Sequence, residues 1–400
     1  MLAHSPPLPI VIDHFHTDNG DCTPANDVEG IMLALKHRDR VRRIRLKMSI
    51  SMENVFVLID GEFPMLEYLC IGPIYNMRHP FPKTFQAPQL RHLISFNSTY
   101  PIGSPLLSAA IRLVTLSLVN IPLSTYFQPD ELLHRVSLMP QLEILWIAFD
   151  SFYSRHYANL GVTDMHNATH ISLLHLRYFQ FGGFNAYSEA LLSRIAAPHL
   201  EVVRVSFWEK PPFSVLSLLQ FMSTSQHLKL GSAILVFDVR ETKLSVYPHR
   251  TARLSVFDMF IEGSSGHNVS DAAQILNVLS PLLSLVIDLT LDHKDNPLSP
   301  ELENEAEPTN WRILLRSFNN VKTLFAANGV VEKLSRSLQL DDGESPDDLL
   351  PELKELAYSP SNDYTNAFDG FVDARQHAGH PVTLVDLKNA VSTPLCIRGP

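Results

Sequence analysis

One apolar pattern recurs along the chain and restricts its fold more than any other feature of the sequence. Segments of the form L-x-x-L-x-L, in which another apolar residue can replace a leucine, begin at positions 41, 66, 113, 142, 200, 286 and 353. Weaker copies begin at 90, 176 and 321, and less certain ones lie near Leu230 and Leu254. Alternating apolar residues predict a strand with one buried face. Because one short strand cannot cover that face alone, a copy about every 28 residues predicts stacked units that share a core.

Stretches with helical spacing lie between these strand cores, at 27–38, 53–63, 129–138, 186–195, 214–222, 271–279, 311–318 and 366–377. A proline stands before several strand cores, at positions 64, 88, 140 and 198, and disfavours helix in the residue before it. The alternation predicts an α/β leucine-rich-repeat solenoid, with a curved parallel sheet on its concave face and helices on its convex face. The alternative is an ordinary α/β domain with a parallel sheet, which rarely repeats one strand core at nearly fixed spacing.

The repeats run through most of the sequence, so we expect residues 1–400 to form a single domain of irregular repeats. Acidic residues and prolines gather in two places that interrupt the repeats, and there we expect exposed loops, near 292–310 and 341–348.

The composition and charge of the chain limit the kinds of partner and the cellular compartment that we expect. The chain has 400 residues, of which 45% are hydrophobic and 18% are charged, and its formal net charge is −10. A negative chain is not expected to bind phosphate backbones, and no run of 18 apolar residues could span a bilayer. The three cysteines are too few and too scattered for a disulfide framework, and the N-terminus lacks the basic segment of a signal peptide. We therefore expect no nucleic-acid or membrane partner, and a cytoplasmic or nuclear location.

Several segments resemble the large fungal family of F-box proteins with C-terminal leucine-rich repeats, and together they cover nearly the whole chain. These segments are 7–12, 35–46, 85–93, 139–145 and 350–356. In that family an N-terminal F-box docks the adaptor of a cullin ubiquitin ligase, and the repeats hold the substrate. The first strand of this type begins at residue 10 here, which leaves no room for an F-box before it. The resemblance therefore implies the substrate-recognition repeats of such a receptor, with the adaptor as a partner only if an F-box is encoded upstream.

The densest charge cluster belongs to the first repeat, where seven basic residues between Lys36 and Lys47 are opposed by Asp39 alone. A solvated edge that aids solubility is one reading of such a cluster. Side chains alternate along a strand, so the residues between the core positions project onto the concave face. The same register in later repeats places a set of basic, aromatic and acidic residues there, a composition typical of protein-binding surfaces. The predicted binding residues, for a protein or peptide partner, are Arg43, Arg45, Lys47, Tyr68, His92, Phe96, Trp146, Tyr178, Arg204, Asp288 and Asp292.

Catalytic chemistry has one candidate segment, residues 13–22, which contains two histidines, three aspartates and Cys22. His14 and His16 share a face if the first strand continues, and such side chains bind zinc and related metals. No second paired cluster supplies further ligands, and no nucleophile or phosphate-loop motif is present. We therefore expect a non-enzymatic binding module without a metal or cofactor. A metal-dependent hydrolase that uses His14 and His16, or a structural scaffold without a ligase link, are the alternatives.

Overall fold

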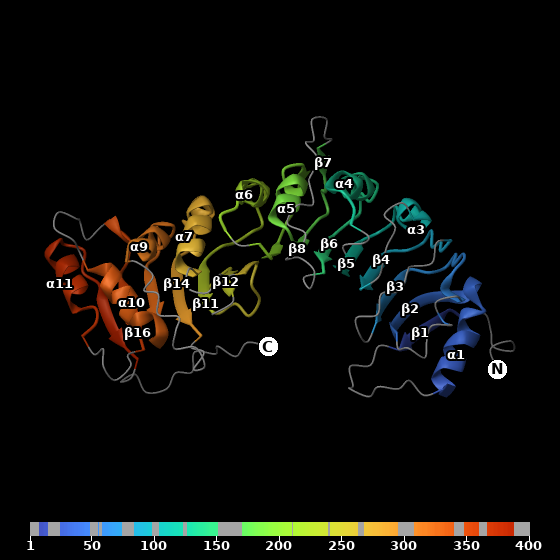
Figure 1. The fold of residues 1–400 in the computed structure, drawn as a ribbon, viewed down its shortest axis with the longest axis horizontal. Coiled ribbons are helices and arrows are strands. Elements are labelled where there is room, and N and C mark those ends of the chain that lie inside the picture. Colours follow the sequence, from blue (N-terminus) through green and yellow to red (C-terminus); the bar gives the residue numbers. More distant parts are fainter. Residues whose placement is uncertain are drawn as a thin grey trace. The chain divides into compact units, whose positions relative to one another are not determined.

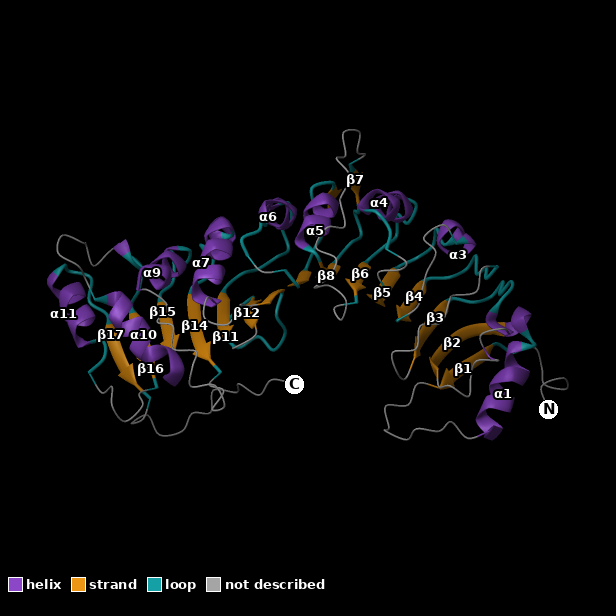
Figure 2. Cartoon of the chain, in the orientation of Figure 1, coloured by secondary structure: helices purple, strands orange, loops and turns teal. Residues whose placement is uncertain are grey.

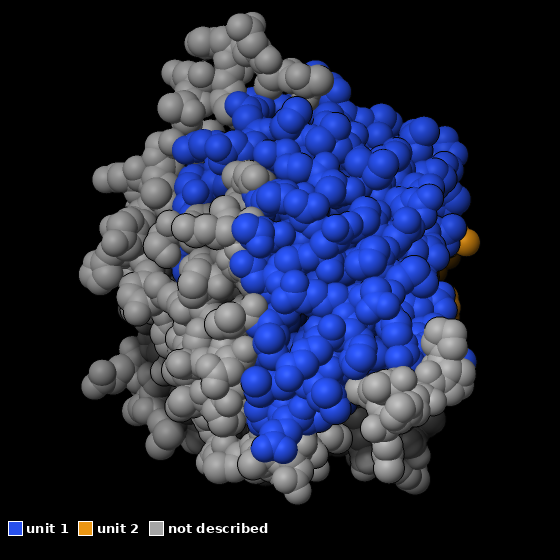
Figure 3. All heavy atoms as spheres, turned by 90° about the vertical axis from the view of Figure 1, so that its right-hand side faces the viewer, with its two compact units in different colours: residues 1–203, 220–227 blue, residues 204–219, 228–400 orange. Residues whose placement is uncertain are grey.

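The computed structural model describes residues 8–14, 25–48, 55, 58–73, 84–97, 104–122, 126–150, 170–209, 211–238, 241–262, 268–294, 308–339, 348–359 and 366–387. The chain divides into two compact units, which Figure 3 shows in different colours. Unit 1 contains residues 1–203 and 220–227, and unit 2 contains residues 204–219 and 228–400. The division falls inside strand β10 (Val202–Phe207) and helix α6 (Leu216–Ser223). Each unit is described by itself below, and a single domain over the whole chain stays a prediction.

The sheet of unit 1 follows the order of the sequence, and each described pairing between neighbouring strands is parallel. Its strands are β1 (Ile10–His14), β2 (Val41–Met48), β3 (Tyr68–Pro73), β4 (His92–Phe96), β5 (Thr115–Ile121), β6 (Ile144–Phe149) and β8 (Tyr178–Gly183). A second small sheet pairs β7 (Ile171–Ser172) with β9 (Ile195–Ala196). The helical segments are α1 (Ala25–Leu35), η2 (Arg38–Arg40), α3 (Pro105–Ala109), α4 (Pro129–Ser137) and α5 (Asn185–Leu192). Figure 1 shows α3, α4 and α5 on the same side of strands β4 to β8.

A repeated turn precedes many of the parallel strands and explains where the prolines stand. The first apolar residue of a repeat donates its backbone N–H to the carbonyl three residues earlier, as from Leu66 to Phe63 and from Leu142 to Met139. The residue at that earlier position is buried, and a proline often follows it, as Pro64 and Pro140 do. Proline suits the second position of such a turn because its φ is already fixed. These prolines therefore shape the turn that leads each strand into the sheet.

Unit 2 contains a sheet in the order β10-β13-β12-β11-β14-β15-β16-β17. After β10, these strands are β11 (Ser232–Phe237), β12 (Glu241–Tyr247), β13 (Phe257–Glu262), β14 (Asp288–His293), β15 (Thr323–Ala326), β16 (Glu355–Tyr358) and β17 (Thr383–Asp386). After α6, the helices are α7 (Asn268–Val278), α8 (Ser280–Leu283), α9 (Pro308–Arg316), α10 (Asn328–Leu338) and α11 (Asp369–His377). Figure 2 shows α7 and α9 on one side of strands β11, β14 and β15.

Strands β11, β12 and β13 depart from the parallel arrangement that the repeats predict. Both pairings of β12 are antiparallel, whereas β11 pairs with β14 in parallel. Three residues separate β11 from β12, and the Asp238 N–H donates to the Glu241 carbonyl across this turn. A connection between parallel strands needs a dozen residues or more. A link of three residues therefore reverses the direction of the chain. The weak repeat near Leu254 is confirmed in part: Leu254 itself lies between β12 and β13 and is 75% exposed, whereas Phe257 and Met259, at the next two core positions of the motif, are buried in β13.

The leucines of the repeats form the core of each unit, as the sequence predicts. Leu116 and Leu145 in unit 1 and Leu289 and Leu324 in unit 2 are almost fully buried. A parallel strand, a turn and a helix recur in both units, and this arrangement is the leucine-rich-repeat fold. The acidic segment near 292–310 is less of a loop than expected, because β14 extends to His293 and α9 begins at Pro308. Residues 340–347, in the second acidic segment, lie outside the described residues.

Candidate binding surface

Each strand has one row of buried core side chains and one row on the opposite side, which we call the open face. In β2 the core residues Ile44 and Leu46 alternate with Arg43 and Arg45, and β6 alternates in the same way around Trp146. The register of the sheets places the other predicted binding residues at equivalent positions: Tyr68, His92, Phe96 and Tyr178 in unit 1, and Arg204, Asp288 and Asp292 in unit 2. Lys47 lies opposite Gly72 in the β2–β3 pairing, but its side chain is outside the described residues.

The two arginines of β2 are engaged by neighbours on both sides. Arg45 forms an ion pair with Asp13 of β1, with 3.8 Å between the Arg45 Nη1 and Asp13 Oδ2 atoms. The Arg43 guanidinium lies over the ring of Tyr68, 4.4 Å from the ring centroid, in a cation–π contact. Asp13 and Tyr68 thus hold both guanidinium groups across the first three strands. Arg43 and Arg45 thus lie on the open face of β2, with Asp13 beside Arg45.

A line of polar and aromatic contacts continues from Tyr68 into β4 and β5. The rings of Tyr68 and His92 are 5.7 Å apart, and His92 Nδ1 lies 3.1 Å from the Thr115 hydroxyl. Burial lowers the pKa of His92, and the positive charge of Arg91 lowers it further. Burial also raises the pKa of Tyr68. Both effects favour uncharged rings, so the positive charge of this part of unit 1 comes from the arginines.

Phe96 and Trp146 form the apolar part of the open face of unit 1. Their rings meet edge to face, with centroids 6.5 Å apart. Phe96 also covers Gly72, where an added Cβ would lie 3.2 Å from Phe96 Cδ2. Ser117 lies between these strands, directly opposite Trp146 in the β5–β6 pairing, and is buried. The small residues Gly72 and Ser117 therefore lie beside two aromatic rings that project from the open face.

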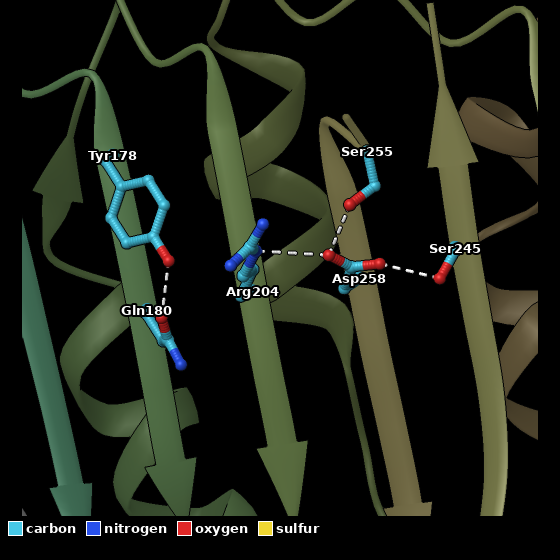
Figure 4. Close-up of polar contacts among 6 residues, drawn as sticks. All are labelled: Tyr178, Gln180, Arg204, Ser245, Ser255 and Asp258. Atoms are coloured by element: carbon cyan, nitrogen blue, oxygen red, sulfur yellow. Dashed lines mark hydrogen bonds and ion pairs between the residues drawn. The ribbon is translucent and has the colours of Figure 1, made fainter. Parts of the chain in front are cut away.

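Strand β8 ends the open face of unit 1 with an internal polar pair. The Tyr178 hydroxyl donates a hydrogen bond of 2.5 Å to the Gln180 side-chain carbonyl on the same strand (Figure 4). This bond fixes the direction of the ring and keeps the amide oxygen satisfied. Tyr178 adds an aromatic surface with a polar tip.

The open face of unit 2 contains a buried carboxylate that the sequence did not reveal. Asp258 on β13 has a side chain only 9% exposed, and Figure 4 shows its polar contacts with Ser245, Ser255 and Arg204. The hydroxyls of Ser245 and Ser255 donate to its two oxygens, at 2.7 and 2.5 Å. Arg204 Nε lies 3.1 Å from Asp258 Oδ2. Arg204 is therefore present where predicted, but its charge is balanced by a buried acid on the adjacent strand.

Acidic residues dominate the remaining charge on the open face of unit 2. Asp288 and Asp292 lie on β14 in one row, and Glu355 stands two strands further along. The Asp292 carboxylate accepts a hydrogen bond of 2.8 Å from the His293 backbone N–H. Lys243 on β12 lies over the Phe260 ring, 5.0 Å from its centroid. Unit 2 thus offers carboxylates and hydroxyls where unit 1 offers guanidinium groups and aromatic rings.

Two features of these faces escaped the sequence interpretation for identifiable reasons. Asp13 was grouped with His14 and His16 as a metal ligand, whereas its position in β1 pairs it with Arg45. Asp258 lies between Phe257 and Met259, two core positions of the weak repeat near Leu254, and the predicted set of binding residues does not include it. The alternation in Phe257–Glu262 is the signal that could have placed it.

The metal candidate is only partly described. His14 ends β1, and the other members of the segment, His16 and Cys22 among them, lie outside the described residues. Within the part of the chain that the structure describes, no three histidine, cysteine or acidic side chains gather closely enough to hold an ion. A helix with the length and apolarity to cross a bilayer is likewise absent from the described residues.

Comparisons with known proteins concern the fold. No protein-family model matches the chain, and no curated protein does. Among solved structures, TLR13 in its complex with ssRNA13 is 12% identical over 88% of this chain and 43% of its own, with a TM-score of 0.34. The leucine-rich-repeat-containing protein LegL7 from Legionella pneumophila is 10% identical over 93% of this chain and 98% of its own, with a TM-score of 0.30. This chain thus spans less than half of the TLR13 chain. Our assignment of the fold rests on the strand order and the repeated turns.

Proposed function

We propose that the open face of unit 1 binds an extended segment of a partner protein and that the chain acts as a non-enzymatic binding module. The observation that carries this proposal is the set of large side chains on strands β2, β3, β4 and β6, namely Arg43, Tyr68, Phe96 and Trp146. A folded protein gains little stability from half-exposed aromatic and guanidinium groups. Such groups are, however, the residues that contribute most to binding in protein interfaces.

The contacts within this face suggest the chemistry of the partner segment. An acidic group would face Arg43 and Arg45, which bring two positive charges together on β2. An apolar side chain would pack against Phe96 and Trp146, whose rings stand above the small residues of β3 and β5. Unit 2, with Asp288 and Asp292, would favour basic groups instead. The two units would therefore favour partner groups of opposite charge.

Charge reversal and truncation test this proposal by their different kinetic effects. Once crosslinking has identified a partner, Arg43→Glu with Arg45→Glu should slow association and weaken its salt dependence, because these charges steer the encounter. Trp146→Ala should speed dissociation and weaken binding by about 2 kcal/mol or more. Arg112→Glu with Arg135→Glu is the matched control, since both side chains lie off the open face, Arg112 after α3 and Arg135 in α4. If both open-face variants keep full affinity while the control loses it, the binding site lies elsewhere.

We further propose, from the family resemblance of the sequence segments, that the repeats select a substrate for a cullin ubiquitin ligase. In that family the F-box binds the adaptor, so residues 1–400 alone should not retain purified adaptor in a pull-down. The decisive measurement is the half-life of the identified partner in cells with and without the gene for this chain. An unchanged half-life would contradict the ligase role and leave the binding role standing.

A further inference from the structure

Two exposed histidines of unit 1 lie beside each other although they are 28 residues apart in sequence. His199 Nδ1 is 3.2 Å from His227 Nε2, and the ring centroids are 5.3 Å apart. His199 precedes β10 and His227 follows α6, so two different connections bring them together. Neither ring belongs to the open faces described above.

Backbone and hydroxyl contacts hold both connections in place. The turn that carries His199 is closed by the Leu200 N–H, which donates to the Ala197 carbonyl at 3.2 Å. The Ser225 hydroxyl donates to the Leu200 carbonyl at 2.6 Å and accepts from the His227 N–H at 3.1 Å. Ser225 thus ties the segment after α6 to the turn before β10. The two imidazoles are neighbours because this framework places them, so little ordering is needed for them to act together.

The distance between the two nitrogens matches the separation of two nitrogen ligands bound to one metal ion. Imidazole nitrogens bind Zn²⁺ at about 2.0–2.1 Å, and two such ligands at a tetrahedral angle are about 3.3 Å apart. A small rotation about χ2, which is soft in histidine, can turn both lone pairs toward one point. We propose that His199 and His227 form a two-histidine site for a late first-row divalent cation, namely Zn²⁺, Ni²⁺ or Cu²⁺.

The ligand set fixes the class of ion and the strength of binding. Neutral imidazole suits Zn²⁺, Ni²⁺ and Cu²⁺, whereas Mg²⁺ and Ca²⁺ prefer oxygen ligands. Water would complete the coordination, because no third histidine, cysteine or acidic residue among the described side chains joins the pair. The bound ion would replace a hydrogen bond between two exposed rings by two metal–nitrogen bonds. It would thereby clamp the segment after α6 onto the turn before β10, both of which belong to unit 1.

Calorimetric titration of the full chain with Ni²⁺, and electron paramagnetic resonance with Cu²⁺, test the site. We expect saturable binding and a Cu²⁺ spectrum with two nitrogen ligands. His199→Gln and His227→Gln should each weaken binding by at least about tenfold, since even a supporting group beyond the ligands is worth that much. His249→Gln is the matched control, because His249 is also exposed and contacts only Thr251 among the hydrogen bonds described for its ring. Mg²⁺ should not compete.

The rival metal segment near the N-terminus needs its own variant. His14→Gln with His16→Gln should leave the nitrogen signal of the His199 and His227 pair in place. If the double variant His199→Gln with His227→Gln binds Ni²⁺ and Cu²⁺ as the unmodified chain does, the proposal is overturned. The proposal is also overturned if the His249→Gln control loses as much affinity as the two single variants do. Neither result bears on the binding function proposed for the open face of unit 1.

Discussion

Units 1 and 2 build the same kind of core and carry opposite chemistry on their open faces. Leu145 in unit 1 and Leu289 in unit 2 occupy equivalent buried positions. Beside them on the open face stand Trp146 in unit 1 and Asp288 in unit 2. The repeat therefore specifies one side of each strand and leaves the other side free to vary. The charge of the open face can therefore differ in sign between two stretches of one chain while the packing beneath it stays the same.

The two units also treat charged groups differently. In unit 1 the Arg45 and Asp13 side chains are both more than a third exposed, with 3.8 Å between their charged atoms. In unit 2 Asp258 is buried and satisfied by two hydroxyls and Arg204. A surface pair of the first kind contributes little to stability, whereas a buried acid becomes costly once its partners are removed. Four measurements test or sharpen this comparison.

The largest effect should come from a charge in either core. Leu145→Asp and Leu289→Asp should each lower the free energy of unfolding by more than about 3 kcal/mol, through a buried charge and lost packing. Ile144→Asp, on the open face of the same strand, should cost about 1 kcal/mol. Urea unfolding followed by circular dichroism measures all three. A mild Leu145→Asp would show that the register of the repeat is wrong.

Removal of a carboxylate should destabilise the chain more on the open face of unit 2 than on that of unit 1. Asp258→Ala should cost about 2 kcal/mol or more, because it leaves Ser245, Ser255 and Arg204 without their shared acceptor. Asp13→Ala in unit 1 should cost about 0.5 kcal/mol or less, as for other exposed ion pairs. The midpoints of urea unfolding give the difference. Equal costs for the two variants would contradict the distinction between buried and exposed charge.

A smaller and opposite effect is expected within the aromatic core of unit 1. Tyr187 is 1% exposed and stacks on Phe181, and its buried hydroxyl has no hydrogen-bond partner among the residues that the structure describes. Tyr187→Phe should therefore stabilise the chain by about 1 kcal/mol. Tyr178→Phe is the control, because its hydroxyl is bonded to Gln180 and its loss should not stabilise. Thermal unfolding of both variants compares the two hydroxyls, and a destabilised Tyr187→Phe would reveal a missing partner.

The smallest effect concerns pH and unit 1. Burial and Arg91 lower the pKa of His92, against weaker opposite effects of Glu143 and Glu67. Between that lowered pKa and the ordinary value near 6.5, the unfolded chain binds more protons than the folded chain, so stability falls as the pH falls. The unmodified chain should lose more stability between pH 7.5 and 5.5 than His92→Gln does. Urea midpoints at the two pH values supply the test, and parallel losses would exclude a contribution from His92.

The repeat and its faces were predictable because they depend on local sequence. Alternation around Leu116 and Leu145 identifies the buried side of each strand, and the same alternation places Arg43 and Trp146 on the other side. Helix α10 was also within reach, since Val330, Val331 and Leu334 recur at helical spacing, but it was not predicted.

The rest was hidden because it depends on contacts between distant residues. Alternation shows that a segment is a strand but gives no direction, so the reversal at Glu241 follows only from the short link before it. The partners of Asp258 come from three different elements or links, at Arg204, Ser245 and Ser255, and no spacing in the sequence relates them. The pair of His199 and His227 likewise depends on how two turns approach each other.

The antiparallel strand pairings of unit 2 show why added strands should come in even numbers. Strand β12 reverses the chain and β13 reverses it again, so β13 points in the same direction as β11 and β14. An even number of added strands returns the chain to its original direction. The next strand, β14, therefore pairs with β11 in parallel. A single extra strand would leave every later repeat upside down against its neighbour. Insertions into a scaffold of this kind should therefore be tolerated in pairs, which gives designers a site where a hairpin can be lengthened or exchanged while the polarity of the sheet is retained.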